Sequence, residues 1–202
     1  MLRRLAYLSP IFLRAALPAC SLPKLGAQMS SSAGLSEGCV GAPAAAGSRL
    51  PLQGAESLMA KKGSFGSTAQ PVQANLQYGI SNSLANRICC FNRHYAEPSG
   101  SFTGTSFFAE ANRSGETTFY DSVTGRPLFI APRGRTFAEF EAESRAHGWP
   151  SFRDAEVVWD DVRCLPDGEC VSTAGTHLGH NLPDSKGNRY CINLCSVAGR
   201  PL

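Results

Sequence analysis

Short runs of strand-forming residues, each followed by a turn signal, constrain the fold of this chain more than any other feature. The runs are Thr117–Ser122, Pro127–Pro132 and Ala155–Asp160. Aromatic and β-branched residues favour strands, and the Pro/Gly-containing turns between these runs leave room for short elements only. The pattern predicts a mainly β domain with minor helix.

One helix is expected within this β pattern, from Thr136 to His147. Phe137 and Phe140 lie three residues apart and would share one face, while acidic residues occupy the other. Thr136 followed by Glu139 three residues later is typical of a capping box, which predicts where the helix begins.

The first part of the chain has the composition of a targeting segment. Residues 1 to about 60 are rich in Ala, Ser, Leu, Pro and Gly, and contain no acid before Glu37. This composition predicts an organelle transit peptide, with the mitochondrion as destination, a plastid as the alternative, and an untargeted tail as the third interpretation. The apolar run 5–17 is interrupted by Pro10 and Arg14 and is too short to cross a membrane.

Composition also suggests where the folded domain begins. Residues 61–88 are rich in Gly, Ser, Gln and Asn and are predicted to be a linker, so that residues 89–202 form the domain. With 19 basic and 16 acidic residues the net charge is only +3, which gives no reason to expect nucleic acid as a partner. A monomer without membrane contact is expected.

The cysteines indicate a reactive thiol and not a disulfide scaffold. The eight cysteines are unevenly spaced, which favours a reducing compartment. Cys191 follows Arg189 by two residues, so in a strand the two side chains share a face. A neighbouring positive charge favours the thiolate, the nucleophilic form of cysteine. His177 and His180 are candidate acids because imidazole titrates near neutral pH.

Four more residues are candidates for supporting roles around such a thiol. Trp149 and Phe152 could form an apolar wall. Asn193, two residues beyond Cys191, would lie on the same strand face. Asp184 could orient or charge a neighbouring histidine or arginine.

Three blocks carry a resemblance to a known family. The blocks are HGWPSFR (147–153), THLGHNLPDS (176–185) and NRYCINL (188–194), with shorter ones at SFTG (101–104) and GRPLF (125–129). From roughly residue 95 to its end the chain resembles the methionine-R-sulfoxide reductases, the MsrB or SelR family. The resemblance implies a fold of two antiparallel sheets, the β-tent, with minor helices.

The same resemblance implies an activity and roles for its residues. The activity is thiol-dependent reduction of methionine-R-sulfoxide, free or in oxidised proteins, through a sulfenic acid on the nucleophile. The roles fall on Cys191 as nucleophile, His177 and His180 as proton donors, Trp149 as wall of the methyl pocket, and Arg189, Asn193 and Asp184 as flanking groups.

The chain departs from the family at the positions of a structural zinc site. Members often carry two CxxC pairs, but the first pair corresponds here to Asp121 and Thr124, and only Cys164 and Cys170 represent the second. Two thiols do not complete a tetrahedral zinc site. We therefore expect neither bound zinc nor another bound cofactor.

The route that regenerates the thiol is a further departure. His147 stands where many members have a resolving cysteine. Cys195 lies four residues beyond Cys191, roughly 13 Å along a strand, whereas a disulfide requires Cα atoms within about 7 Å. Cys170 and Cys90 are the intramolecular candidates. The favoured scheme is direct attack on the sulfenic acid by an external thiol, namely glutathione, glutaredoxin or thioredoxin.

Other interpretations use the same residues without catalysis. The β-tent domain could be a non-catalytic module that binds a peptide or small ligand. The two histidines of the HLGH block, with nearby cysteines, could bind a metal. Cys191 could be a structural thiol, because free cysteines are often simply buried.

Overall fold

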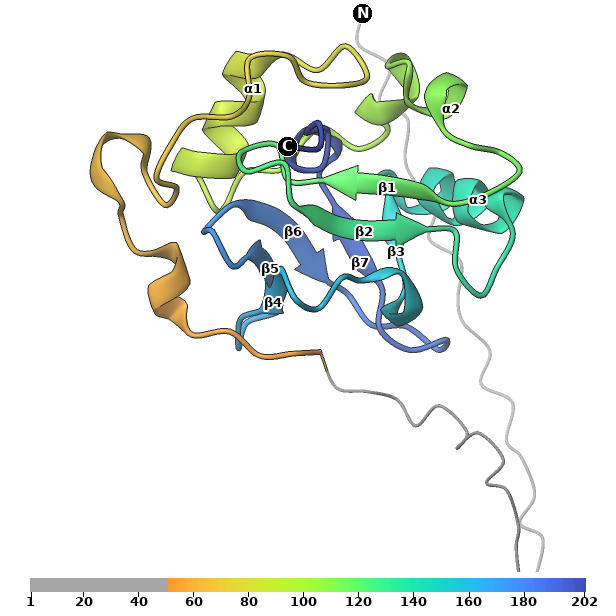
Figure 1. Ribbon diagram of the computed structural model, residues 1–202. Helices are drawn as coiled ribbons and strands as arrows, with labels where there is room; N and C mark the ends of the chain where they lie inside the picture. The colour runs from red at the N-terminus through yellow and green to blue at the C-terminus, as the bar shows by residue number, and fades with distance from the viewer. Residues whose placement is uncertain (1–50) are drawn as a thin grey trace, which may run out of the picture. The chain divides into compact units, whose positions relative to one another are not determined.

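The computed structural model describes residues 51–202, so residues 1–50 of the predicted leader lie outside the described residues. Two antiparallel sheets form the frame (Figure 1). One has two strands and the other has five, in the order β3-β7-β6-β5-β4. The strands are β1 (Thr117–Tyr120), β2 (Pro127–Ala131), β3 (Ser151–Phe152), β4 (Val162–Cys164), β5 (Glu169–Ser172), β6 (His177–Asn181) and β7 (Tyr190–Ile192). A mainly β fold with two antiparallel sheets is thus confirmed.

The helices are short and lie outside the sheets. They are α1 (Asn82–Asn86), α2 (Phe107–Glu110) and α3 (Phe137–His147). A π-helical turn follows α1 directly, and single 3-10 turns occur at Glu56–Met59, Gly63–Phe65, Ser101–Gly104, Asp154–Glu156 and Leu194–Ser196. Within residues 51–202, every helix falls short of the length and apolar character needed to cross a bilayer.

The predicted helix is confirmed as α3, and its ends are fixed as expected. Thr136 Oγ1 accepts from the Glu139 amide at 3.3 Å, and the Glu139 carboxylate accepts from the Thr136 amide at 2.7 Å. Phe137 and Phe140 are buried. Gly148 ends the helix with φ +86°, a left-handed conformation that favours glycine.

An aromatic cluster joins the two sheets and α3. Phe129 of β2 stacks on Phe152 of β3 at 4.3 Å between ring centroids, and Phe119 of β1 meets Phe152 edge-on at 5.0 Å. Phe140 of α3 packs on the same ring at 5.5 Å. Such contacts add to the free energy of apolar burial, so this cluster fixes β3 relative to the small sheet.

The prediction of a strand over residues 155–160 is wrong. The chain instead makes a 3-10 turn, and only Val157 forms a bridge, to Phe129. The cause is Glu156, which is fully buried and accepts hydrogen bonds from the Arg153 amide and from the Arg135 guanidinium. These bonds hold the segment in a turn.

Residues 61–88, predicted as a linker, pack into the domain. Val72, Tyr78, Ala85 and Ile88 are each at most 6% exposed. Gln53 pairs with Cys164 of β4, so the domain includes residues from the predicted leader as well. Ala85 and Ile88 have the three-residue spacing of a helix, but the Gly/Ser/Gln/Asn-rich composition of the segment as a whole indicated a linker.

Candidate functional site

A row of four polar side chains crosses the five-stranded sheet. Cys191 of β7 is paired with Ser151 of β3 on one side and with His180 of β6 on the other, and His180 is paired with Glu169 of β5. Residues directly opposite in adjacent strands point to the same face. The pairing therefore brings a thiol, a hydroxyl, an imidazole and a carboxylate together on one face.

A β-bulge adds His177 to this face. Side chains three apart in a regular strand point to opposite faces. Here the pairing steps from Gly179 to His177 on β6 while β5 advances by one residue, so Leu178 is the extra residue. As a result the rings of His177 and His180 lie 5.8 Å apart between centroids.

The thiol of Cys191 lies against a guanidinium. Arg189 Nη1 donates to Cys191 Sγ at 2.6 Å, so the predicted shared face is observed. Arg189 Nε donates to Asp184 at 3.2 Å, and Asp184 also accepts two bonds from Arg153, at 2.9 and 3.0 Å. The bonds from Arg153 are the main reason that the pKa of Asp184 is held well below its usual value. The carboxylate therefore stays charged and fixes Arg189.

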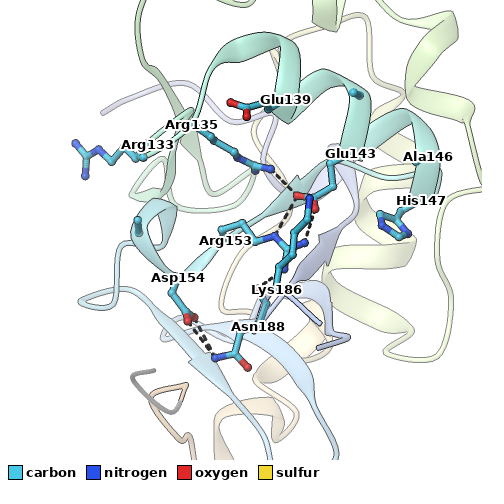
Figure 2. Close-up of a pocket in the computed structure, with 13 residues that line it drawn as sticks. Arg133, Arg135, Glu139, Glu143, Ala146, His147, Arg153, Asp154, Lys186 and Asn188 are labelled. Carbon is cyan, nitrogen blue, oxygen red and sulfur yellow. Dashed lines mark hydrogen bonds and ion pairs between the residues drawn. The ribbon is translucent and has the colours of Figure 1, made fainter. Parts of the chain in front are cut away.

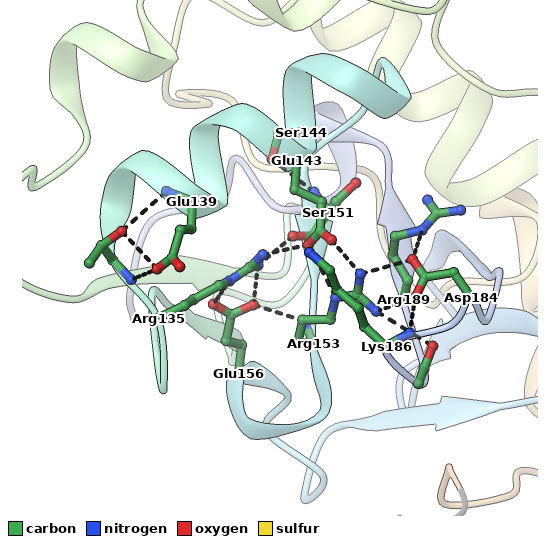
Figure 3. Close-up of polar contacts among 12 residues, drawn as sticks. Arg135, Glu139, Glu143, Ser144, Ser151, Arg153, Glu156, Asp184, Lys186 and Arg189 are labelled. Atoms are coloured by element: carbon green, nitrogen blue, oxygen red, sulfur yellow. Dashed lines mark hydrogen bonds and ion pairs between the residues drawn. The ribbon is translucent and has the colours of Figure 1, made fainter.

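Ion pairs continue from Asp184 to α3 (Figure 3). Arg153 is paired with Glu143, which also accepts from Arg135 at 2.5 Å. Burial alone would raise the pKa of Glu143, but the two guanidinium groups outweigh it and the pKa is lowered. Arg135 is held at its other side by the buried Glu156. Figure 2 shows Arg135 and Arg153 both directed at Glu143. These three residues belong to the lining of a hollow of about 640 Å³.

His177 is held by a carboxylate. Its Nδ1 lies 2.6 Å from Glu169 Oε1, and both side chains are 3% exposed. Glu169 also accepts from Arg93 Nε at 2.8 Å. Burial would raise the pKa of Glu169, yet the bonds from His177 and Arg93 lower it, so the group is an acceptor. Nδ1 of His177 therefore donates to Glu169, which leaves Nε2 for another contact.

Cys191, His177 and His180 line a cavity of about 400 Å³. Its lining residues are Arg93, His94, Tyr95, Ala96, Trp149, His177, Gly179, His180, Leu182, Cys191 and Asn193. Trp149 is part of the wall, as predicted, and its Nε1 donates to the Glu97 carbonyl at 3.0 Å. Phe152 does not line the cavity. It is paired with Tyr190, so its side chain points to the opposite face of the sheet, where it is fully buried in the aromatic cluster.

Asn193 and Glu97 tie the cavity wall to the chain that follows the thiol. Asn193 Oδ1 accepts from the Glu97 amide at 2.9 Å, and Asn193 Nδ2 donates to the Leu178 carbonyl at 3.0 Å. The Glu97 carboxylate accepts from the amides of Leu194, at 2.5 Å, and Cys195, at 3.3 Å. Burial raises the pKa of Glu97 despite these donors.

The other cysteines considered as partners do not line this cavity. Cys170 is paired with Gly179 and fully buried in the core, on the face opposite Cys191. Cys90 is buried in the π-helical turn. The chain does turn after Asn193, but Cys195 is buried in the same small cluster as Cys90. An intramolecular disulfide from Cys191 to any of them needs a rearranged sheet or core.

Asp121 and Thr124 do not offer zinc a set of ligands. Asp121 is 1% exposed and accepts hydrogen bonds from Thr176 Oγ1 and from the Val123 amide. Cys164 and Cys170 are not among its partners. In the described part of the chain one other group brings metal-ligating atoms within 4.8 Å of one another, Glu143, His147 and Asp184. Both of its carboxylates are already neutralised by Arg153.

Sequence reasoning missed the residues that hold the predicted ones. Glu169 could have been predicted from the sequence, because it faces His180 across the hairpin of β5 and β6. Arg93, Tyr95 and Glu97 lie far from the three blocks in sequence. They approach the site only through the tertiary fold.

The arrangement can support nucleophilic attack by sulfur on a small group, with proton transfer from an adjacent imidazole. A scan of the chain against protein-family models found no match.

Proposed function

We propose that the protein reduces methionine-R-sulfoxide to methionine with a thiol as reductant. The observation that carries the proposal is the contact of Arg189 Nη1 with Cys191 Sγ at 2.6 Å on the wall of a cavity shared with two histidines. The guanidinium places a positive charge and an N–H donor against the attacking sulfur. Trp149, in the same wall, supplies an apolar surface for a methyl group.

The first half of the reaction transfers oxygen from the substrate to the enzyme. The Cys191 thiolate attacks the sulfoxide sulfur while a histidine donates a proton to the sulfoxide oxygen. The hydroxyl then moves from the substrate sulfur to the Cys191 sulfur: a sulfur–oxygen bond forms on Cys191, while the substrate sulfur–oxygen bond and the sulfur–sulfur bond break, which releases methionine and leaves a sulfenic acid. Sulfoxide and thiol are thus converted to sulfide and sulfenic acid, with no atom unaccounted for.

We assign the proton donor to His177. When both ring nitrogens carry a proton, the Nδ1–H of His177 is used by Glu169, so the proton on Nε2 is the one given to the substrate. Burial, followed by the neighbouring His177, lowers the pKa of His180 from its ordinary value of 6.5. His180 is therefore neutral at pH 7 and better suited to hydrogen-bond the substrate or a water than to supply a proton.

The second half restores the thiol. An external thiol attacks the Cys191 sulfenic acid, a sulfur–sulfur bond forms and water leaves. A second thiol then releases Cys191 and departs as a disulfide. The burial of Cys170, Cys90 and Cys195 away from the cavity favours this route, with thioredoxin, glutaredoxin or glutathione as reductant.

Turnover of the two epimers of a dabsylated methionine sulfoxide with dithiothreitol tests the proposal. We expect reduction of the R epimer only, and none by Cys191→Ser. Cys90→Ala, which removes a thiol outside the cavity, is the matched control and should retain turnover. Saturable binding of the R epimer without any reduction by the wild-type chain would instead favour the non-catalytic binding module.

A further inference from the structure

Two thiols face each other on the core side of the five-stranded sheet. Cys164 of β4 and Cys170 of β5 are directly paired, and their Sγ atoms lie 3.6 Å apart. Both are free and at most 2% exposed. Cys191, the proposed nucleophile, belongs to the opposite face, so this pair is separate from the site described above.

The backbone at this pair suits a covalent bond between the strands. The Cys164 amide donates to the Leu52 carbonyl and its carbonyl accepts from the Gly54 amide, both at 2.9 Å, so neither group points at β5. The next bond of the hairpin runs from the Leu165 amide to the Glu169 carbonyl at 2.8 Å. Cys164 and Cys170 therefore form a non-hydrogen-bonded pair, whose Cα atoms are about 4.5 Å apart, inside the range that disulfides span.

We propose that Cys164 and Cys170 form a dithiol that a peroxide oxidises to a cross-strand disulfide. The Cys164 sulfur attacks one peroxide oxygen, the oxygen–oxygen bond breaks, and the released oxygen leaves as water, giving a sulfenic acid. The Cys170 sulfur then attacks that sulfenic acid, a sulfur–sulfur bond forms, and a second water leaves with the Cys170 proton. Two thiols of an external reductant reverse the change, so two cysteines and one hydrogen peroxide give one disulfide and two waters.

The order of attack follows from the surroundings of the two thiols. A hydrogen bond from Cys170 lowers the pKa of Cys164, whereas burial raises the pKa of Cys170 well above its ordinary value. Cys164 also lies on β4, the edge strand of the sheet, covered by the segment around Gln53. Cys164 is thus the thiol that peroxide oxidises first.

The disulfide would stabilise β5, the strand that carries Glu169 of the proposed site. It closes the turn from Leu165 to Glu169, and Glu169 holds His177. A loop this short still restricts the unfolded chain, so we expect the oxidised protein to unfold roughly 5 °C higher than the reduced one. The oxidised state keeps the cavity, because the new bond lies on the other face.

Peptide mapping of the full chain after treatment with hydrogen peroxide tests this proposal. The protein is alkylated under denaturing conditions and cut with trypsin, which yields one peptide, 164–186, holding both cysteines. We expect that peptide to be unalkylated and lighter by two hydrogen atoms than the dithiol, and to separate into two fragments only after cleavage at Glu169 followed by reduction. The wild-type chain suffices for this measurement, so it does not depend on the folding of a variant.

Two variants distinguish the pair from the proposed nucleophile. Cys191→Ser should form the 164–170 disulfide to the same extent as the wild type, and Cys164→Ser should not form it. Full alkylation of both cysteines in peroxide-treated wild type would overturn the proposal, as would a disulfide joining Cys170 to Cys191. Loss of the disulfide in Cys191→Ser would show that oxidation passes through Cys191 and would overturn direct attack by Cys164.

Discussion

At the scale of single residues, Arg189 connects the carboxylate of Asp184 to the sulfur of Cys191. Its Nε and Nη1 donate to different groups, so its planar guanidinium is fixed at both contacts. Lysine can supply the charge but not this geometry. Substitutions of Arg189 can therefore distinguish the effect of its charge on the reactivity of Cys191 from the effect of its geometry.

Replacing Arg189 should slow the reaction of Cys191 with iodoacetamide. We expect Arg189→Met to reduce the alkylation rate at pH 7 about tenfold, because the variant removes the positive charge and the N–H donor in contact with the Cys191 sulfur. Arg189→Lys should fall between this variant and the wild type. The rate is followed at Cys191 by mass spectrometry, with circular dichroism as the check on folding. An unchanged rate in Arg189→Met would contradict the electrostatic role.

Glu169→Gln should reduce turnover and change the acid stability of the fold. Loss of the charge beside His177 should lower kcat on the order of tenfold with little change in KM. The variant also leaves Arg93 without its buried carboxylate partner, which should lower the free energy of unfolding by about 2 kcal/mol. The pKa of Glu169 is lower in the folded protein than its ordinary value of 4.5, so its stabilising contribution is present above that pH.

This contribution is lost as the pH falls below about 4.5 and through the folded pKa of Glu169. The difference in unfolding free energy between wild type and Glu169→Gln should thus be largest at neutral pH and shrink in acid. Urea unfolding at several pH values measures it. A difference that does not depend on pH would show that Glu169 acts only through packing.

At the scale of elements, β6 determines the site through its bulge and its glycine. A Cβ at Gly179 would lie 2.1 Å from the carbonyl oxygen of Cys191 on β7. Backbone atoms cannot move aside as a flexible side chain can, so β7 would have to shift. Gly179→Ala should therefore reduce kcat at least tenfold and destabilise the fold by about 1–3 kcal/mol.

The matched control for this change is Gly187→Ala, because a Cβ there meets no atom within 4 Å although φ is +109°. Both variants introduce the same methyl group, but only Gly179→Ala presses on the strand that carries Cys191. Turnover and thermal unfolding of the two variants are compared. Equal losses of turnover would indicate that the close approach of β6 and β7 has no part in activity.

The elements also show how far the sequence can be interpreted. The capping box and apolar face of α3 and the alternation around Cys191 are local patterns, and each was predicted correctly. The segment 155–160 has strand-forming residues, but the buried Glu156 and its arginine partners override them, and such partners come from other elements. Phe152 was misassigned because its face depends on the register of β3 with β7, which residue order alone does not give.

At the scale of the whole molecule, the domain depends on residues well before its predicted start. A chain beginning at residue 89 would lack Val72, Tyr78, Ala85 and Ile88, all buried. Burial of a large apolar side chain contributes about 1.5–3 kcal/mol, and the stability of a whole domain is only about 5–15 kcal/mol.

We therefore expect residues 89–202 to be unfolded or aggregated when expressed alone, and residues 51–202 to unfold cooperatively. Thermal unfolding followed by circular dichroism compares the two lengths under the same conditions. Cooperative unfolding of the shorter chain at a similar temperature would show that the segment before residue 89 is dispensable for the fold.

Glu97 has a consequence for the way the cavity can move. Its amide is bound to Asn193, its carbonyl to Trp149, and its carboxylate to the amides of Leu194 and Cys195. Displacing any one of these three segments strains the hydrogen bonds of the other two. We therefore expect the amides of Glu97, Leu194 and Cys195 to exchange with deuterium at a common rate, as one cooperative unit.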